Sequence, residues 1–428
     1  MRSADRSRRF LGVLLSLYVA PGLGGQAAAQ KTVLTVVHGE ERTIAMDEDA
    51  IARFEADHPD VDVELVWSPS GRNDRILAIM AAGNAPDLIY QDIGAPVTEW
   101  VTQGRVIDLT PYVERHPEHF AGWIPAVLDL TKTFGRQWAL PRQNLTTYAT
   151  WYNIDHFEEA GLAPPASDWT WDDFRAIARR LTRDLSGDGT LDRFAYDNSF
   201  FFWHSWVKNA GGSVYDETGR RVVFDSPESR KAIEFLHALR WEDHVMPQPG
   251  ELQRSGVNGF LDGNTSMIQR QPLFWQQVRD APAELRTGVV LEPVGPGPVQ
   301  YTMANTNAWM IPVGSKNPDL AFELLMYLTD ERTGMKALEV GAMPIHVELV
   351  REYFGAGVDV RNFRETYFAN TGRPLFSANP ALPDSGGYIA RIIAETVDTN
   401  RIDLAQAFAQ YIPAAQAGLD EFWAALGR

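Results

Sequence analysis

The sequence contains no cysteine. It therefore cannot form disulfide bonds, thiolate metal sites or a lipid anchor on an N-terminal cysteine. Positive charge is also scarce, because 39 Lys and Arg residues stand against 56 Asp and Glu residues and leave a formal net charge of -17. This balance excludes nucleic acid as an expected partner, since the chain would repel a phosphate backbone. Beyond the N-terminal segment, no hydrophobic run suggests a membrane helix.

The N-terminal segment predicts a secretory signal peptide. Four arginines within the first nine residues precede an apolar run at 10–20, and three alanines at 27–29 supply a cleavage site. The run is shorter than the roughly 20 residues that a spanning helix needs. We therefore expect residues 1–29 to be removed and the mature chain, beginning at Gln30, to be free in a periplasm without a lipid anchor. The pair Arg8-Arg9 leaves both the Sec and the twin-arginine export routes open.

The first part of the mature chain alternates strand and helix patterns. Hydrophobic residues make up 45% of the 428 residues, enough to bury a large core divided between two lobes. Apolar strand patterns at 33–37, 61–67 and 88–90 alternate with helical patterns at 46–54 and 76–80. This order predicts parallel βαβ units and an α/β fold. Because ligands lie beyond the carboxyl ends of such strands, the segments that follow them should line one crevice.

Further helices are predicted by their capping residues and apolar faces. Thr170 followed by Asp173 has the spacing of a capping box, and Ser226 followed by Pro227 is a typical helix start. Later apolar faces predict helices at 321–328, 388–397 and 404–422.

Nine short segments, taken in order, resemble the extracellular solute-binding proteins of carbohydrate ABC importers, the group that includes maltose-binding protein. One of them is Ala-Ala-Gly-Asn-Ala-Pro-Asp-Leu at 81–88. The full set lies at 51–59, 81–88, 138–153, 159–162, 170–174, 209–212, 260–264, 315–322 and 341–344. Each segment alone is a weak signal, but their shared order extends the resemblance over essentially the whole mature chain.

The resemblance implies a two-lobe periplasmic binding protein fold, with a central sheet flanked by helices in each lobe and a hinge between them. The N-terminal lobe would comprise 30–142 plus 304–343, and the C-terminal lobe 144–303 plus 344–428. It also implies a monomeric, cofactor-free protein that is not an enzyme. Such a protein binds a sugar or polyol in the interlobe cleft and delivers it to the transmembrane permease subunits of an ABC importer.

Family positions also imply the ligand-binding residues, since sugars need aromatic faces for their C–H surfaces and polar groups for their hydroxyls. The polar candidates are Glu40, Glu41, Gln91, Asp92, Asn144, Thr146, Arg270, Gln271, Asn307, Tyr388 and Arg391. The aromatic candidates are Trp203, Trp206, Trp275 and Trp309. The alternatives are solvated loops or caps for the polar residues and core packing for the tryptophans. Relatives have Gly and Trp where this chain has Gln271 and Leu273, and Trp275 comes two residues late.

An acidic loop predicts a calcium site, because its oxygen ligands are spaced as in an EF-hand loop. These ligands are Asp184, Ser186, Asp188, Thr190 and Asp192, but the twelfth position, which is normally a bidentate Glu, is Ala195. An Asx-rich surface turn is the alternative. A second function class also stays open at this level: a periplasmic carbohydrate hydrolase or lyase would need two carboxylates about 5 to 9 Å apart across a cleft.

Overall fold

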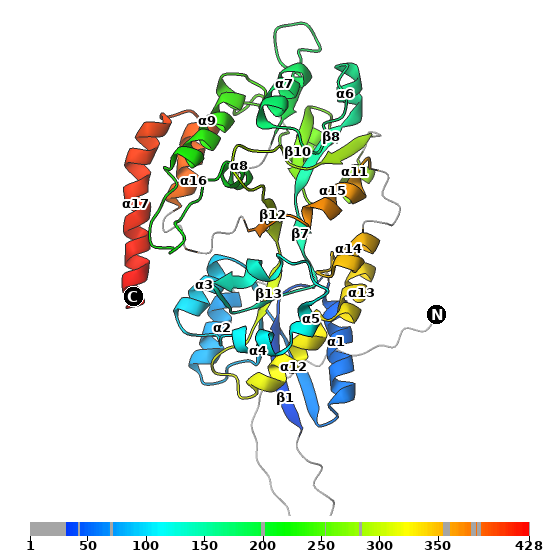
Figure 1. Ribbon diagram of the computed structural model, residues 1–428, viewed down its shortest axis with the longest axis vertical. Coiled ribbons are helices and arrows are strands. Elements are labelled where there is room, and N and C mark those ends of the chain that lie inside the picture. The colour runs from blue at the N-terminus through cyan, green and yellow to red at the C-terminus, as the bar shows by residue number, and fades with distance from the viewer. Residues whose placement is uncertain are drawn as a thin grey trace, which may run out of the picture.

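The computed structural model describes residues 31–41, 43–68, 72–197, 202–252, 254–281, 285–353, 360–377, 382 and 387–427. The predicted signal peptide and the expected mature terminus Gln30 lie outside these residues. The described chain forms two α/β lobes, one above the other in Figure 1, joined by a narrow central connection. No helix in these described segments combines the length and apolar character needed to cross a membrane.

The lower lobe contains a five-stranded sheet in the order β2-β1-β3-β13-β6. Its strands are β1 (Thr32–His38), β2 (Val61–Trp67), β3 (Leu88–Asp92), β6 (Leu140–Pro141) and β13 (Asn307–Met310). β1 pairs in parallel with β2 and β3, which confirms the predicted βαβ order. β13 is antiparallel to both β3 and β6, so a segment from late in the chain completes the sheet.

Helices cover this sheet because their apolar residues recur at helical spacing. In α1 (Ile44–Asp57), Met46, Ala50 and Phe54 are all fully buried, and Phe54 shares a core with the sheet and with α12. The other helices are α2 (Arg72–Ala81), α3 (Ala95–Thr102), α4 (Thr110–Arg115), α5 (Pro117–Phe120), η1 (Leu128–Thr131), α12 (Pro318–Thr329) and α13 (Glu331–Glu339). A small antiparallel hairpin of β4 (Lys132–Thr133) and β5 (Arg136–Gln137) also belongs to this lobe.

The upper lobe contains a four-stranded sheet in the order β11-β8-β10-β9. Its strands are β8 (Ala149–Asn153), β9 (Phe194–Tyr196), β10 (Thr265–Arg270) and β11 (Thr287–Val290). Every residue of these four strands is buried, as expected for a sheet that helices cover on both faces.

The helices of the upper lobe begin largely where their capping residues predict. The capping box of Thr170 and Asp173 starts α7 (Trp171–Leu181), and Ser226 caps α9 (Pro227–Trp241). The others are α6 (Ile154–Glu159), α8 (Trp203–Asn209), α10 (Val257–Leu261), α11 (Phe274–Arg279), α15 (Phe363–Asn370), α16 (Tyr388–Ile393), the π-helix η2 (Ala394–Asp398) and α17 (Leu404–Ala425). The helix α14 (Val347–Tyr353) lies at the junction, where it contacts both α13 and α15 (Figure 1).

A three-stranded sheet, in the order β14-β12-β7, joins the lobes at the centre of Figure 1. Its strands are β7 (Thr146–Thr147), β12 (Thr302–Asn305) and β14 (Leu375–Phe376). Next to β7, the buried amide of Gln143 donates to the carbonyl oxygens of Thr329 and Asp330 and accepts from the backbone N–H of Ile345. One side chain thus ties two chain segments together at the junction. The partition into 30–142 plus 304–343 and 144–303 plus 344–428 stays a prediction.

Candidate functional site

A polar pocket of about 150 Å³ lies where this hinge sheet meets both lobes. Its walls come from the loop after β1, from β7, from the turn between β12 and β13, from the segment after β10 and from the end of α14. The pocket brings together five predicted ligand-binding residues, namely Glu40, Asn144, Thr146, Gln271 and Asn307. It also includes polar residues that the sequence did not single out, namely Thr43, Asn305, Thr306 and Tyr353.

Hydrogen bonds fix the orientation of the two asparagines in this pocket. Asn144 Nδ2 donates to Asn307 Oδ1 over 2.6 Å, and the backbone N–H of Asn307 donates to Asn144 Oδ1 over 3.1 Å. The hydroxyl of Thr306 also donates to Asn144 Oδ1, and Asn307 Nδ2 donates to Asp92 Oδ1. Asp92, a further predicted residue, lies opposite Asn307 in the pairing of β3 with β13. The network pre-orients amide and carboxylate groups of the kind that bind hydroxyl-rich molecules.

Behind the pocket, a buried ion pair fixes the start of the hinge to α1. Asp47 and Arg142 are both fully buried, and the Arg142 guanidinium donates to Asp47 Oδ2 from Nε over 3.1 Å and also from Nη2. Arg142 also donates to the hydroxyl and the carbonyl oxygen of Thr43, and the His38 ring lies 3.0 Å from Asp47 Oδ2. Burial by itself would raise the pKa of Asp47, but Arg142 and His38 lower it below its usual value. No motif in the sequence predicted this cluster.

The upper lobe presents aromatic and cationic side chains around the predicted Arg270. Its guanidinium lies 5.3 Å from the ring centroid of Phe202, which packs edge-on against Tyr148. Arg270 Nη1 donates to the carbonyl oxygen of Gln269, and burial lowers the pKa of the guanidinium. Neither Tyr148 nor Phe202 was predicted, because their sequence context gives no periodic or motif signal.

A glutamate is buried in the same lobe. The Ser205 hydroxyl donates to Glu292 Oε1 over 3.4 Å. Among the described residues, Glu292 Oε2 has no hydrogen-bond partner. Burial raises its pKa to about 8, although Ser205 and the guanidinium of Arg373 act in the opposite direction. Glu292 is therefore largely protonated at neutral pH.

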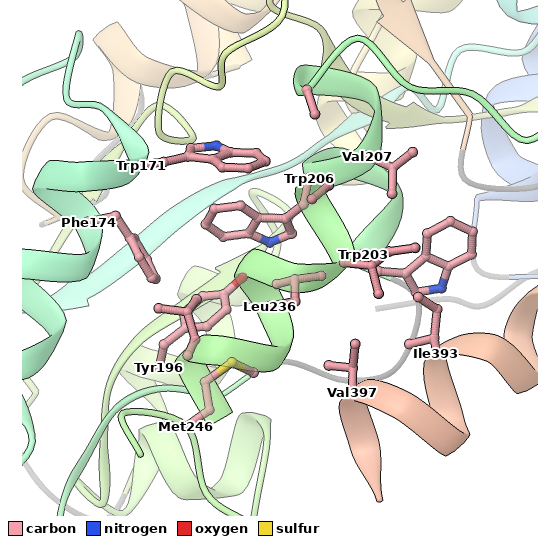
Figure 2. Close-up of a cluster of buried hydrophobic side chains, with 14 of the residues drawn as sticks. Trp171, Phe174, Tyr196, Trp203, Trp206, Val207, Leu236, Met246, Ile393 and Val397 are labelled. Carbon is pink, nitrogen blue, oxygen red and sulfur yellow. The ribbon is translucent and has the colours of Figure 1, made fainter. Parts of the chain in front are cut away.

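The four predicted tryptophans occupy different environments. Trp206 lies between Trp171 and Phe174 in the core of the upper lobe, and Trp203 lies at the edge of the same core beside Ile393 (Figure 2). Trp203 also lines a second pocket, of about 180 Å³, on the β14 edge of the hinge sheet.

The other two tryptophans belong to different parts of the structure. Trp309 is fully buried in the core of the lower lobe, where it packs edge-on against Tyr90. Trp275 is half-buried on α11, and the Arg279 guanidinium lies 4.7 Å from its ring centroid. The positions of Trp206 and Trp309 favour the core-packing alternative, whereas Trp203 and Trp275 reach pocket surfaces.

The remaining predicted residues lie outside the polar pocket. Gln91 is buried on β3 and accepts a hydrogen bond from the backbone N–H of Asp92, and Glu41 is exposed in the loop after β1. At the start of α16, the half-buried Tyr388 stacks on Tyr411, and the exposed Arg391 lies over the ring of Tyr388. Their roles in ligand binding stay predictions.

The acidic loop at 184–192 forms a turn in which carboxylates bind backbone N–H groups. Asp184 accepts from the N–H groups of Gly187 and Gly189, and Asp192 accepts from those of Leu185 and Ser186. Across the described segments, no cluster of three or more His, Asp or Glu side chains is arranged to hold a metal ion. The geometry favours the surface-turn alternative, and the calcium site stays a prediction.

The fold and sequence identify the class of protein. Residues 39–335 match the sequence profile of the bacterial extracellular solute-binding proteins, and the chain belongs to this family. A putative binding protein of Brucella abortus is 24% identical over 368 residues, which cover 82% of this chain and 85% of the relative. The resemblance drawn from the nine segments is thereby confirmed.

Solved structures share the fold. The sugar-binding protein MalE from Xanthomonas citri has a TM-score of 0.75 at 17% identity, and the match covers 93% of this chain and 100% of that protein. An ABC substrate-binding protein from Listeria monocytogenes, in complex with cycloalternan, has a TM-score of 0.69 at 19% identity, with 92% and 99% covered. These likenesses confirm the two-lobe α/β fold. The family consists of binding proteins, so the hydrolase or lyase alternative receives no support.

Proposed function

We propose that this protein is the periplasmic substrate-binding component of an ABC importer, and that it binds a sugar or polyol between its lobes. The observation that carries the proposal is the polar pocket at the hinge, which combines residues from both lobes within a solute-binding fold. Its amide, hydroxyl and carboxylate groups suit a ligand with many hydroxyls. Two of the proteins that share the fold, the sugar-binding protein MalE and the protein in complex with cycloalternan, support the same ligand class.

Binding would couple the solute to the relative position of the lobes. A solute that touches Asn307 and Glu40 on one side and Gln271 on the other makes all of its contacts only when the lobes approach. Because only differential affinity shifts a conformational equilibrium, such a solute favours the closed arrangement. The closed form would then deliver the solute to transmembrane permease subunits.

A melting screen tests the ligand class directly. The purified protein is heated with monosaccharides, disaccharides, polyols and glycerol phosphates, each at millimolar concentration. A solute with a dissociation constant near 1 μM, present at a hundredfold excess, stabilises the folded state by about 2.7 kcal/mol. We expect at least one sugar or polyol to raise the melting temperature. If none of these compounds raises the melting temperature, the proposed ligand class is wrong. If only glycerol phosphates raise it, the ligand is a phosphorylated solute and not a free sugar or polyol.

Export and oligomeric state are separate parts of the proposal. We expect a mature protein that begins at Gln30, carries no lipid and is monomeric. Mass spectrometry of periplasmic material reads the terminus and any lipid mass, and light scattering gives the molecular mass in solution. If the protein is found soluble in the cytoplasm and retains Met1, the export proposal is wrong. The melting screen tests the binding function separately.

A further inference from the structure

The two lobes also contact each other away from the hinge, through an aromatic pair. The ring centroids of Phe134 and Trp423 lie 5.3 Å apart with the ring planes inclined at 56°. Phe134 is at the tip of the β4–β5 hairpin, and Trp423 is near the end of α17, whose C-terminal end approaches the lower lobe in Figure 1. This distance and inclination are typical of a favourable aromatic pair.

Phe134 is fixed to the lower lobe. The backbone carbonyl of Gln137, at the end of the hairpin, accepts a hydrogen bond from the N–H of Leu109, a fully buried core residue. The amide of Gln137 donates to Thr131, and the indole of Trp138 donates to the carbonyl oxygen of Thr133. The hairpin therefore moves with the lower lobe.

Trp423 is fixed to the upper lobe. It continues a stripe of buried residues along α17 that includes Tyr411 and Leu419, at helical spacing. Its indole N–H donates to the carbonyl oxygen of Gly219 over 2.8 Å, and the Arg220 guanidinium lies 4.6 Å from its ring centroid. Any relative movement of the lobes must therefore separate or slide the two rings.

The backbone at Phe134 has a conformation that its side chain does not favour. Phe134 has a φ of 53° and Gly135 a φ of 73°, as in two-residue hairpin turns that usually contain Asn-Gly. A left-handed backbone is unfavourable for a residue with a bulky side chain. The residue as a whole stays 43% exposed, so burial in its own lobe does not account for the choice of Phe. Local structure alone would select Asn here, which points to a role for the ring outside its own lobe.

A hairpin connects the contact to the second pocket, which Trp203 lines. Tyr215 belongs to the same pocket and pairs with Val222 in a β-bridge, and the turn between these two residues carries Gly219 and Arg220. One hairpin thus runs from the wall of the pocket to Trp423.

We propose that Phe134 and Trp423 form an interlobe latch, which holds the lobes together at the β14 edge of the junction and sets the resting opening of the cleft. The chain segments of the hinge connect the lobes covalently. The aromatic contact is non-covalent, so it can break and form again, and it opposes separation of the lobes only weakly. This role does not depend on which solute binds.

The absence of cysteine allows a direct test by pulsed electron paramagnetic resonance. Glu118→Cys on α5 and Glu234→Cys on α9 place one spin label on an exposed position of each lobe. Distances between the labels are measured without solute in this parent, and again after adding Phe134→Asn, Phe134→Tyr or Val313→Ala. Asn accepts the left-handed backbone, so Phe134→Asn removes the ring without destabilising the turn. Val313 is another exposed hydrophobic residue of the lower lobe and serves as the matched control.

We expect Phe134→Asn to shift the distribution towards longer distances and to lower the ratio of latched to separated lobes about fivefold, the scale of one aromatic pair. Phe134→Tyr keeps the ring and should match the parent, as should Val313→Ala. Identical distributions for the parent and Phe134→Asn would overturn the latch. A shift of the same size in Phe134→Tyr or in Val313→Ala would also overturn it, because the effect would then not come from the aromatic pair.

Discussion

Asn144 and Asn307 exchange two hydrogen bonds across the hinge, although 163 positions separate them in the sequence. Each side chain thereby holds the other in one orientation, and Asn307 extends the arrangement to Asp92. The polar surface of the pocket is thus ordered before any ligand arrives, which lowers the entropic cost of binding.

Replacing Asn307 with Ala should therefore weaken solute binding. The variant removes a predicted ligand contact and leaves Asn144 and Asp92 without this partner, for which we expect a loss of about 1.5 kcal/mol or roughly tenfold in affinity. Isothermal titration with the solute found in the melting screen measures the change. Asn258→Ala, at an exposed position on α10, is the control and should bind as the parent does. Equal affinities for both variants would remove Asn307 from the site.

Breaking the buried pair of Asp47 and Arg142 should destabilise the fold strongly. Arg142→Met leaves the fully buried Asp47 carboxylate without its guanidinium partner, and breaking a buried ion pair in this way typically costs about 3 to 5 kcal/mol. Urea unfolding measures the loss. Lys31→Met removes the lysine of an exposed ion pair with Asp62 and should change the free energy of unfolding by less than about 1 kcal/mol. Similar losses in the two variants would mean that burial of the pair has no special cost.

Glu292 should make the protein less stable as the pH rises. Its folded-state pKa of about 8 is above the ordinary value of 4.5, so the folded state binds more protons than the unfolded chain between these values. The contribution of this group is largest below about pH 4.5 and disappears as the pH rises through 8. Glu292→Gln should therefore be more stable than the parent at pH 8, by on the order of 3 kcal/mol, and the difference should shrink towards pH 5. Urea unfolding across this range measures it, and a constant difference would contradict the assigned protonation.

Trp206 and Trp203 should respond differently to truncation. Trp206→Ala empties a position surrounded by aromatic rings in the core and should cost about 3 to 5 kcal/mol of stability, with little effect on solute affinity. Trp203→Ala exposes the wall of the second pocket and should weaken binding if that pocket receives part of the solute. Urea unfolding and titration are measured for both variants. A stable Trp206→Ala protein that has lost binding would reverse this assignment.

The sequence predicted the local structure well where a pattern repeats within a few residues. The apolar run at 33–37, the capping residues Thr170 and Ser226 and the parallel start of the first sheet are all confirmed. Contacts between distant segments carry no such repeat. The insertion of β13 beside β3 and the ion pair of Asp47 with Arg142 therefore could not be read from local patterns.

The candidate site shows the same division. The segment after β1 contributes Glu40 to the pocket, whereas no residue of the segment after β3 lines it, although Asp92 at the end of β3 hydrogen-bonds to Asn307. A tryptophan, in contrast, follows the same helical spacing whether its ring faces a core or a cleft. Trp206 and Trp203 are three residues apart on α8, yet one is enclosed by rings and the other reaches a pocket. Only the packing of neighbouring elements separates these two cases.

The late position of β13 has a consequence for how the chain matures. The sheet of the lower lobe needs Asn307–Met310 between β3 and β6, so a nascent chain that stops before residue 310 cannot complete this sheet. The lower-lobe sheet therefore stays incomplete until all strands of the upper-lobe sheet have been synthesised. Such long-range pairing slows folding. A chain that stays incompletely folded through most of its synthesis can still pass through a narrow channel, so the order of its strands would favour the Sec route if the proposed export takes place.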